Sequence, residues 1–402
     1  MTAKRFVSIL FLSLACRHQA SANNRVSVDT ILGKHMTGYQ GWFTCEDGNA
    51  AKHWLNQDNN LVVDMLPDVS EYDPNDLCDL PGYKDRNGNQ IKVFSSQRLG
   101  IVDTHFRWMQ EYGIDGAFLQ HHLSAFGTAE GQNRRMTVAR NVKNSAEKHG
   151  RAWAIMFDVS GSSENTLSIL QDIMPPLKDL ITNSSMYLKT NGKPLVAVWG
   201  FGGKEGRHLH NPTDGLEVIK FLKEEGFSVF GGMVRDTWAN NYNRNAAWTE
   251  LVNSLDVISP WTTSADALTA KEYGLKVEKE MKLIANTPII YSPVIFPGFS
   301  WKNLKDETLN AVPRNGGRFY ENIAKASIAA GAKTLYTAMF DEVDEGTAIM
   351  KTLAKTSELP TSGTFLPLDF DGVDLDSDHF LKLAGNFSRS LKSLDFSEDT
   401  NE

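Results

Sequence analysis

The sequence predicts an α/β fold, a single (β/α)8 barrel, and three observations lead to this prediction. Eight short apolar runs rich in β-branched and aromatic residues recur along the chain, and stretches of helical period separate them. Strands that alternate with helices pair in parallel, and nearly continuous apolar runs indicate burial on both faces. No G-x-G-x-x-G follows the first run, which argues against a doubly wound open sheet, and eight units suit a closed barrel.

Each strand is expected where an apolar run ends in polar or aromatic residues. The runs are residues 35–44, 114–122, 152–160, 194–202, 228–236, 257–262, 288–295 and 334–340. Helices are expected between them, at residues 101–112, 137–149, 166–180, 215–225, 246–255, 268–285 and 319–330. Residues 46–97, rich in Asp, Asn and Pro, form a long insertion after the first strand. The tail at residues 361–391 is a closing segment, whose helix is expected to begin near Asp376 or Asp378.

The composition is that of a globular protein with an excess of acidic residues. The 402 residues include 41 Lys and Arg against 49 Asp and Glu, for a formal net charge of -8, and 41% are hydrophobic. That content is too apolar for a disordered chain. Because binding to a nucleic acid needs clustered Lys and Arg, which the sequence lacks, no nucleic-acid partner is expected.

Residues 1–22 have the pattern of a secretory signal. Two basic residues precede an apolar run at residues 6–15, and Ala20-Ser21-Ala22 forms an A-x-A cleavage site. We therefore expect a barrel domain at residues 23–402 that is secreted or periplasmic, with lipid attachment at Cys16 as an alternative. No later stretch is long and apolar enough to span a bilayer, so no membrane span is expected. A monomer is expected as well.

Cleavage of that signal would leave two cysteines, Cys45 and Cys78. In an oxidising compartment they could form a disulfide, and two unpaired buried thiols are the alternative. The sequence contains no C-x-x-C and no H-x-x-x-H. Neither a metal site nor another cofactor is therefore expected.

Aromatic, amide and carboxylate side chains gather where the expected strands end, which is the face that carries the site in this kind of barrel. Sugars need this mixture, because aromatic rings stack on their C–H faces while Asp, Gln and His bond their hydroxyls. A phosphate site would instead need glycine-rich turns with Lys or Arg. The candidate substrate-binding residues are Tyr39, Gln40, Trp42, Gln120, His121, His122, Asp158, Trp199, Asp236, Trp261 and Asp344. Of four candidate stacking rings, Trp42, Trp199, Trp238 and Trp261, about two are expected to contact the ligand.

The most specific motif is DEVDEGT, residues 341–347, directly after the last expected strand. Adjacent carboxylates repel, so at least one should have a raised pKa, as acid catalysis requires. If the segment turns helically, Glu342 and Glu345 stand on one face with their Cβ atoms about 5–6 Å apart. Such a pair is what cleavage of a glycosidic bond needs. A solvated acidic loop and a structural calcium site are the alternatives.

The EVDEGT of residues 342–347 resembles the E-W-H-E-G-T motif of glycoside hydrolase family 99, the endo-α-1,2-mannosidases and mannanases. The segments YLKTNGKPLVAVWG (187–200) and EYGIDGAFLQ (111–120) are similar to that family and to the broader 71/99-like group. The bacterial members of that group, some of them labelled xylosidase/arabinosidase, are similar to TGYQGWF, VDMLPDVSEYDP and FRWMQEYGIDG (37–43, 63–74 and 106–116). The resemblance extends from the first strand to the last.

The resemblance implies a glycoside hydrolase of the barrel fold that acts on a poly- or oligosaccharide, and the signal pattern of residues 1–22 implies that it is secreted. It implies that Glu342 assists the attack of the substrate's own 2-hydroxyl, through an anhydro-sugar intermediate, and that Glu345 is the general acid. The sequence departs from the family at Val343 and Asp344, where the family has Trp and His. Asp344 could raise the pKa of Glu345 or serve as the base of an inverting enzyme. A carbohydrate-binding barrel without catalysis and a calcium-stabilised scaffold are the other hypotheses.

Overall fold

The structure is a computed structural model that describes residues 25–45, 53–262 and 269–394. At its centre lies a parallel sheet with the strand order β10-β9-β8-β7-β5-β4-β1-β12-β11. These strands are β1 (His35–Tyr39), β4 (Gly116–His122), β5 (Ala152–Asp158), β7 (Lys193–Phe201), β8 (Ser228–Val234), β9 (Val257–Trp261), β10 (Ile290–Tyr291), β11 (Val294–Ile295) and β12 (Leu335–Thr337). β6 (Lys189–Thr190) adds a short antiparallel pair to β7.

The sheet closes on itself through β10 and β11. Only Ser292 and Pro293 separate these two strands, so they are halves of one extended segment. β10 pairs with β9 while β11 pairs with β12, both in parallel. The two ends of the strand order therefore meet, and the predicted (β/α)8 barrel is confirmed.

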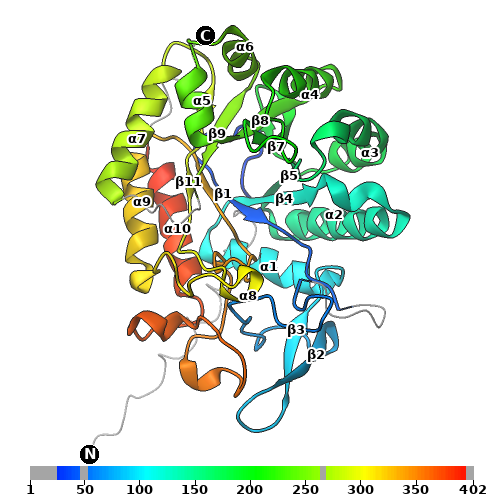
Figure 1. Cartoon of the computed structure of the whole chain (residues 1–402), viewed down its shortest axis with the longest axis vertical. Coiled ribbons are helices and arrows are strands. Elements are labelled where there is room, and N and C mark those ends of the chain that lie inside the picture. The colour runs from blue at the N-terminus through cyan, green and yellow to red at the C-terminus, as the bar shows by residue number, and fades with distance from the viewer. Residues whose placement is uncertain (1–24, 46–52, 263–268, 395–402) are drawn as a thin grey trace, which may run out of the picture.

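Helices surround the barrel (Figure 1). They are α1 (Leu99–Tyr112), α2 (Ala129–His149), α3 (Thr166–Thr182), α4 (Pro212–Glu224), α5 (Arg235–Asn241), α6 (Ala246–Asn253), α7 (Ala270–Leu283), α8 (Lys302–Lys305), α9 (Arg318–Ala329) and α10 (His379–Lys392). Single 3-10 turns lie at η1 (Pro74–Asp76), η2 (Leu123–Gly127), η3 (Ser163–Asn165), η4 (Asn315–Gly317), η5 (Thr356–Glu358) and η6 (Leu368–Asp371). The closing helix α10 begins after Asp378, as expected, and packs against α1, α9 and β1.

Several elements end or begin away from their expected positions, and for three of them the local reason is clear. β1 stops at Tyr39 because the next two N–H groups turn to a carboxylate, that of Asp341, instead of a neighbouring strand. β8 stops at Val234, where α5 begins directly. α2 begins eight residues before the expected residue 137 because Thr128 caps it, accepting a hydrogen bond from the N–H of Gly131.

The insertion after β1 contains an antiparallel hairpin that the sequence did not reveal, β2 (Leu77–Lys84) and β3 (Gln90–Phe94). Cys78 in β2 forms a disulfide with Cys45, with the Cα atoms 6.3 Å apart. This bond joins the hairpin to the segment that follows β1. The expected signal sequence and Cys16 lie outside the described residues. In the described ranges, no helix has the length and apolar character needed to cross a membrane.

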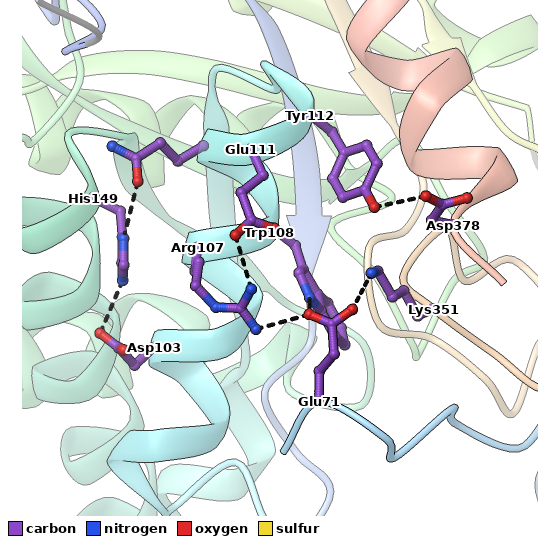
Figure 2. A network of polar contacts seen from close by, with 10 residues as sticks. Glu71, Asp103, Arg107, Trp108, Glu111, Tyr112, His149, Lys351 and Asp378 are labelled. Carbon is purple, nitrogen blue, oxygen red and sulfur yellow. Dashed lines mark hydrogen bonds and ion pairs between the residues drawn. The ribbon is translucent and has the colours of Figure 1, made fainter. Parts of the chain in front are cut away.

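A second tie between the insertion and the barrel centres on Glu71 (Figure 2). Its carboxylate accepts hydrogen bonds from Arg107 Nη2 and Trp108 Nε1 of α1, each at 2.9 Å, and forms an ion pair with Lys351. Burial alone would raise the pKa of Glu71, but its bonds to Lys351, Trp108 and Arg107 outweigh that effect and lower the pKa to about 2. Glu71, to which the sequence assigned no role, joins three separate segments of the chain.

We expect Glu71→Gln to lower the free energy of unfolding by about 1 kcal/mol at pH 7, because one third of the side chain is exposed and solvent screens its ion pairs. A carboxylate with a lowered pKa stabilises the fold fully above pH 4.5 and loses this effect as the pH falls toward 2. Urea unfolding should show that the difference in free energy of unfolding between the variant and wild type is smaller at pH 3 than at pH 7. Glu111→Gln is the matched control, because Glu111 binds the same arginine at 2.8 Å and, in the part of the chain that the structure describes, pairs with no other cation. An equal effect of both substitutions would contradict the role of Glu71.

Candidate active site

The candidate site is a cavity of about 510 Å³ at the carboxyl ends of the barrel strands. In this fold the loops after the strands form the face that binds ligands. Its lining comes from the ends of most strands and from the loop after β11: Gln40, Trp42, Gln120, His122, Asp158, Ser160, Trp199, Arg207, His208, Trp261, Phe299, Trp301, Glu307, Glu342 and Glu345. Both predicted catalytic residues, and seven of the eleven predicted substrate-binding residues, therefore lie on one cavity.

The acidic motif forms a turn after β12, and most of its carboxyl groups are withdrawn from solvent. Asp341, Glu342 and Asp344 are buried, at 0%, 3% and 3% exposure. Glu345 is partly exposed on the cavity wall. The alternative of a solvated acidic loop is therefore wrong.

Hydrogen bonds from neighbouring segments fix this turn. Asp341 accepts the backbone N–H groups of Gln40 at 2.7 Å and Gly41 at 2.9 Å, which joins the end of β1 to the end of β12. Arg314 Nη2 donates to the carbonyl oxygens of Gly346 at 2.7 Å and Ala348 at 2.8 Å. Gly346 has a φ of +63°, and a Cβ there would lie 2.9 Å from that of Ser300. The turn therefore requires glycine at this position.

Burial raises the pKa of both glutamates, and the charges of neighbouring carboxylates add to the effect. For Glu342, burial raises the pKa well above its usual range, and the charges of Glu345, Asp344 and Asp341 add to this effect. Burial raises the pKa of Glu345 to about 7, opposed by the indole of Trp301. Because ionisation of one carboxyl group makes ionisation of the other harder, the pair retains a single proton over an interval of pH.

The hydrogen bonds of Glu342 suit an ionised carboxylate. Gln40 Nε2 donates to its Oε1 at 2.6 Å, and the Thr347 hydroxyl donates to its Oε2 at 3.2 Å. Donors on both oxygens favour the charged form. They also hold the carboxylate on the cavity wall, where a base would be needed.

A second polar group occupies the ends of β4 and β5. Asp158 Oδ2 accepts a hydrogen bond from Gln120 Nε2 at 2.9 Å and lies 3.3 Å from His122 Nε2. Its Oδ1 accepts the backbone N–H of Ser160 at 2.8 Å. Burial lowers the pKa of His122, although Asp158 opposes the shift. This cluster offers donors and acceptors to a polyhydroxylated ligand.

Three of the four candidate stacking tryptophans, Trp42, Trp199 and Trp261, line the cavity. Trp199 meets Trp261 edge to face, with ring centroids 5.4 Å apart. Trp42 stacks on the His53 ring at a centroid distance of 4.5 Å. Trp238 is instead fully buried and packs near Tyr242. The cavity thus combines carboxylates with aromatic walls.

The structure does not bring four predicted substrate-binding residues to the cavity wall. Tyr39 is buried, and its hydroxyl bonds His105 Nδ1 at 2.8 Å. His121 is buried against Phe126. Asp236 is exposed in the first turn of α5 and pairs with Lys276 at 2.9 Å. Asp344 is buried within the acidic motif.

Six lining residues were not among the predicted site residues: Ser160, Arg207, His208, Phe299, Trp301 and Glu307. Phe299 and Trp301 lie four and six residues after the end of β11. The search for site residues at strand ends would have found them if it had continued further into this loop. His208 Nδ1 accepts the backbone N–H of Lys204 at 3.0 Å, which leaves Nε2 to face Ser160 Oγ at 3.1 Å. Among the residues that the structure describes, no three His, Cys, Asp or Glu side chains are grouped as ligands of a metal ion.

Comparison with known proteins finds similarity in the fold. No protein-family model matches the sequence, and no curated protein does. The structure is similar to the family 99 endo-alpha-mannosidase of Bacteroides thetaiotaomicron, with a TM-score of 0.65 and 14% identity over 91% of this chain and 100% of that chain. That enzyme in complex with bis-tris-propane gives a TM-score of 0.66 at 15% identity, with the same coverage. A glycoside hydrolase-like protein gives 0.55 at 14% identity, covering 91% of this chain and 97% of that chain. The resemblance noted in the sequence therefore extends to the fold.

Proposed function

We propose that this protein is a glycoside hydrolase that cleaves a poly- or oligosaccharide with Glu342 and Glu345. The observation that carries the proposal is that these two glutamates project from one turn onto a cavity walled by tryptophans. Glycosidic cleavage needs two carboxyl groups beside the scissile bond, one of them protonated near neutral pH. The shared fold with a family 99 endo-alpha-mannosidase supports the same reaction class.

In the proposed reaction, Glu345 donates its proton to the glycosidic oxygen as the bond from that oxygen to the anomeric carbon breaks. Glu342 accepts the proton of the substrate's 2-hydroxyl, whose oxygen bonds to the anomeric carbon and forms an anhydro sugar. Water then opens this intermediate, giving a proton back to Glu345 while Glu342 returns its proton to the 2-oxygen. The donors from Gln40 and Thr347 support Glu342 as the base, because they stabilise its ionised form.

Val343 and Asp344, the two departures from the family motif, are not part of the cavity lining. They therefore give little support to the alternative of a barrel that binds glycans without cleaving them. Val343 is fully buried, and its carbonyl accepts the N–H groups of Asp64 and Met65, each at 3.1 Å. Asp344 is buried and does not line the cavity, and its charge raises the pKa of Glu342. Both residues thus act on the turn that holds the glutamates.

The test is a screen of the purified protein against α-mannans, other fungal and algal polysaccharides and aryl glycosides, with detection of new reducing ends. We expect release from at least one substrate, and proton NMR of the first-formed anomer would then show retention or inversion. Saturable binding of a glycan with no release by wild type would overturn the hydrolase proposal in favour of the binding protein. The Cys45–Cys78 disulfide supports the further proposal that the protein acts outside the cytoplasm.

We expect kcat/KM to fall as the pH rises through about 7, because the Glu345 proton needed by the leaving group is lost there. At acid pH the activity should also fall, since the pair then holds two protons and lacks a base. Measurement of kcat/KM from pH 4 to 9 on one substrate should give a bell-shaped profile. A rate that stays constant up to pH 9 would contradict Glu345 as the acid.

A further inference from the structure

A second cavity, of about 240 Å³, adjoins the candidate active site. The two share the indole of Trp42, which contacts His122 on the side of the active site and stacks on His53 on the other. Its walls come from the segment after β1, from η2 and from the first three turns of α2: Gly41, Trp42, Phe43, Thr44, His53, Gln97, Ser124, Ala125, Thr128, Gly131, Arg134, Arg135 and Val138.

The two cavities differ in charge. The charged side chains that line the active-site cavity are mainly carboxylates, those of Glu342, Glu345, Asp158 and Glu307, with Arg207 as its single Lys or Arg side chain among the described residues. The lining of the second cavity contains two arginines and, among the described residues, no Asp or Glu. A ligand that spans both would meet carboxylates on one side of Trp42 and guanidinium groups on the other.

Of the two arginines, Arg135 is the one whose charge has no partner among the described residues. Arg134 pairs with Glu130 at 2.7 Å, one turn earlier on α2. Within the described ranges Arg135 has no hydrogen bond, ion pair or ring contact, although its side chain is partly buried. Burial, together with the charge of Arg134, lowers the pKa of Arg135 to about 10. A partly buried guanidinium group with no anion beside it in the described ranges loses part of its hydration without a compensating partner.

The N-terminus of α2 adds to the positive potential of the cavity. Thr128 and Gly131, at the N-terminus of the 21-residue helix α2, line the same cavity, so the positive end of the helix dipole faces it. Gly131 allows the close approach of η2, since a Cβ there would lie 1.9 Å from the carbonyl oxygen of Ala125. The approach of η2 closes one wall of the cavity.

We propose that this second cavity is a subsite for an anionic sugar, a residue that carries a carboxylate or a sulfate, with Arg135 and Arg134 as its ligands. Planar guanidinium groups bind both anions with paired hydrogen bonds. This inference rests on the proposed glycoside hydrolase function and defines its substrate class. The preferred substrate is then a glycan in which an acidic sugar neighbours the neutral sugar at the two glutamates.

The test compares matched pairs of oligosaccharides: glucuronate-bearing ones with their carboxyl-reduced counterparts, and sulfated ones with their desulfated counterparts. Binding to the full protein is measured by calorimetry. We expect the acidic member of one pair to bind about tenfold more tightly, the size of one charged hydrogen bond. Arg135→Gln should remove this preference and leave the affinity for neutral sugars unchanged. The two pairs distinguish carboxylate from sulfate.

Arg140→Gln is the matched control, because Arg140 lies exposed on the same helix outside both cavities. It should retain the preference for acidic ligands. Arg135→Gln should fold normally and unfold at the same or a higher temperature than wild type, because it removes a charge that has no ion pair with any described residue. Equal affinity for acidic and neutral partners, or an unchanged preference in Arg135→Gln, would overturn the subsite. If the subsite proposal failed in this way, loss of cleavage in Glu342→Gln would still support the glycoside hydrolase function. Failure of the subsite proposal is thus distinguishable from failure of the proposed function.

Discussion

Glu342→Gln and Glu345→Gln are each expected to lower kcat/KM at least about 10³-fold while the protein remains folded. A positioned acid or base contributes about 10²–10⁴-fold to a rate, and an amide can neither accept nor donate the proton in question. Both side chains line the cavity, and Gln40 can still donate to an amide oxygen at position 342. The measurement is steady-state hydrolysis of a substrate found in the screen, with circular dichroism to verify the fold.

Stability provides an independent check on these variants. Because burial raises the pKa of Glu342, its ionised form destabilises the native state, and this penalty grows as the pH rises above the pKa of the unfolded chain. The neutral glutamine should therefore leave the melting temperature unchanged or raise it. Asp236→Asn is the control, since Asp236 was predicted to bind substrate but lies exposed on α5, outside the cavity. Full activity in both glutamine variants would defeat the two-carboxylate proposal.

The barrel could be predicted because its strands are buried on both faces. Each expected apolar run contains an observed strand, and the run at residues 288–295 contains both halves of the segment that closes the sheet. Strand ends were predicted less accurately, since they depend on partners distant in sequence. The bonds from Gln40 and Gly41 to Asp341, which end β1, join residues 300 or more positions apart.

Predicted site residues line the cavity where two conditions are met: the residue lies at the end of a strand, and its side chain points to the cavity side of that strand. Successive side chains of a strand point to opposite sides. Gln120 and His122 line the cavity, whereas His121 between them is buried against Phe126. Gln40 and Trp42 likewise line it, while Tyr39 faces His105. The period of two residues was available in the sequence and could have removed His121 and Tyr39.

The part played by the insertion could not be predicted, because its contacts depend on tertiary structure alone. Asp64 is fully buried, and its carboxylate accepts the hydroxyl of Ser300 at 2.5 Å and the N–H groups of Lys302 at 2.9 Å and Asn303 at 2.7 Å. These residues flank Trp301, which lines the active-site cavity beside Glu345. The insertion therefore supports the wall of the candidate site that contains Trp301.

Asp64→Ala is expected to lower the free energy of unfolding by about 3 kcal/mol, because three donors lose their acceptor in a buried site. It should also lower kcat/KM about 10²-fold through displacement of Trp301, since small errors in position are costly in catalysis. Urea denaturation and steady-state kinetics measure the two effects. Asp64→Asn retains one acceptor oxygen and should fall between Asp64→Ala and wild type in both.

Asp58→Ala separates this positioning role from a general effect on the insertion, because Asp58 is exposed in the same segment and should change neither quantity. If Trp301 is displaced, the pKa on the alkaline side of the rate profile should rise in Asp64→Ala, since the indole opposes the upward shift of the Glu345 pKa. A variant that merely lost stability would retain the wild-type profile at temperatures where it is folded. Loss of stability with an unaltered profile and unaltered kcat/KM would show that the wall does not depend on Asp64.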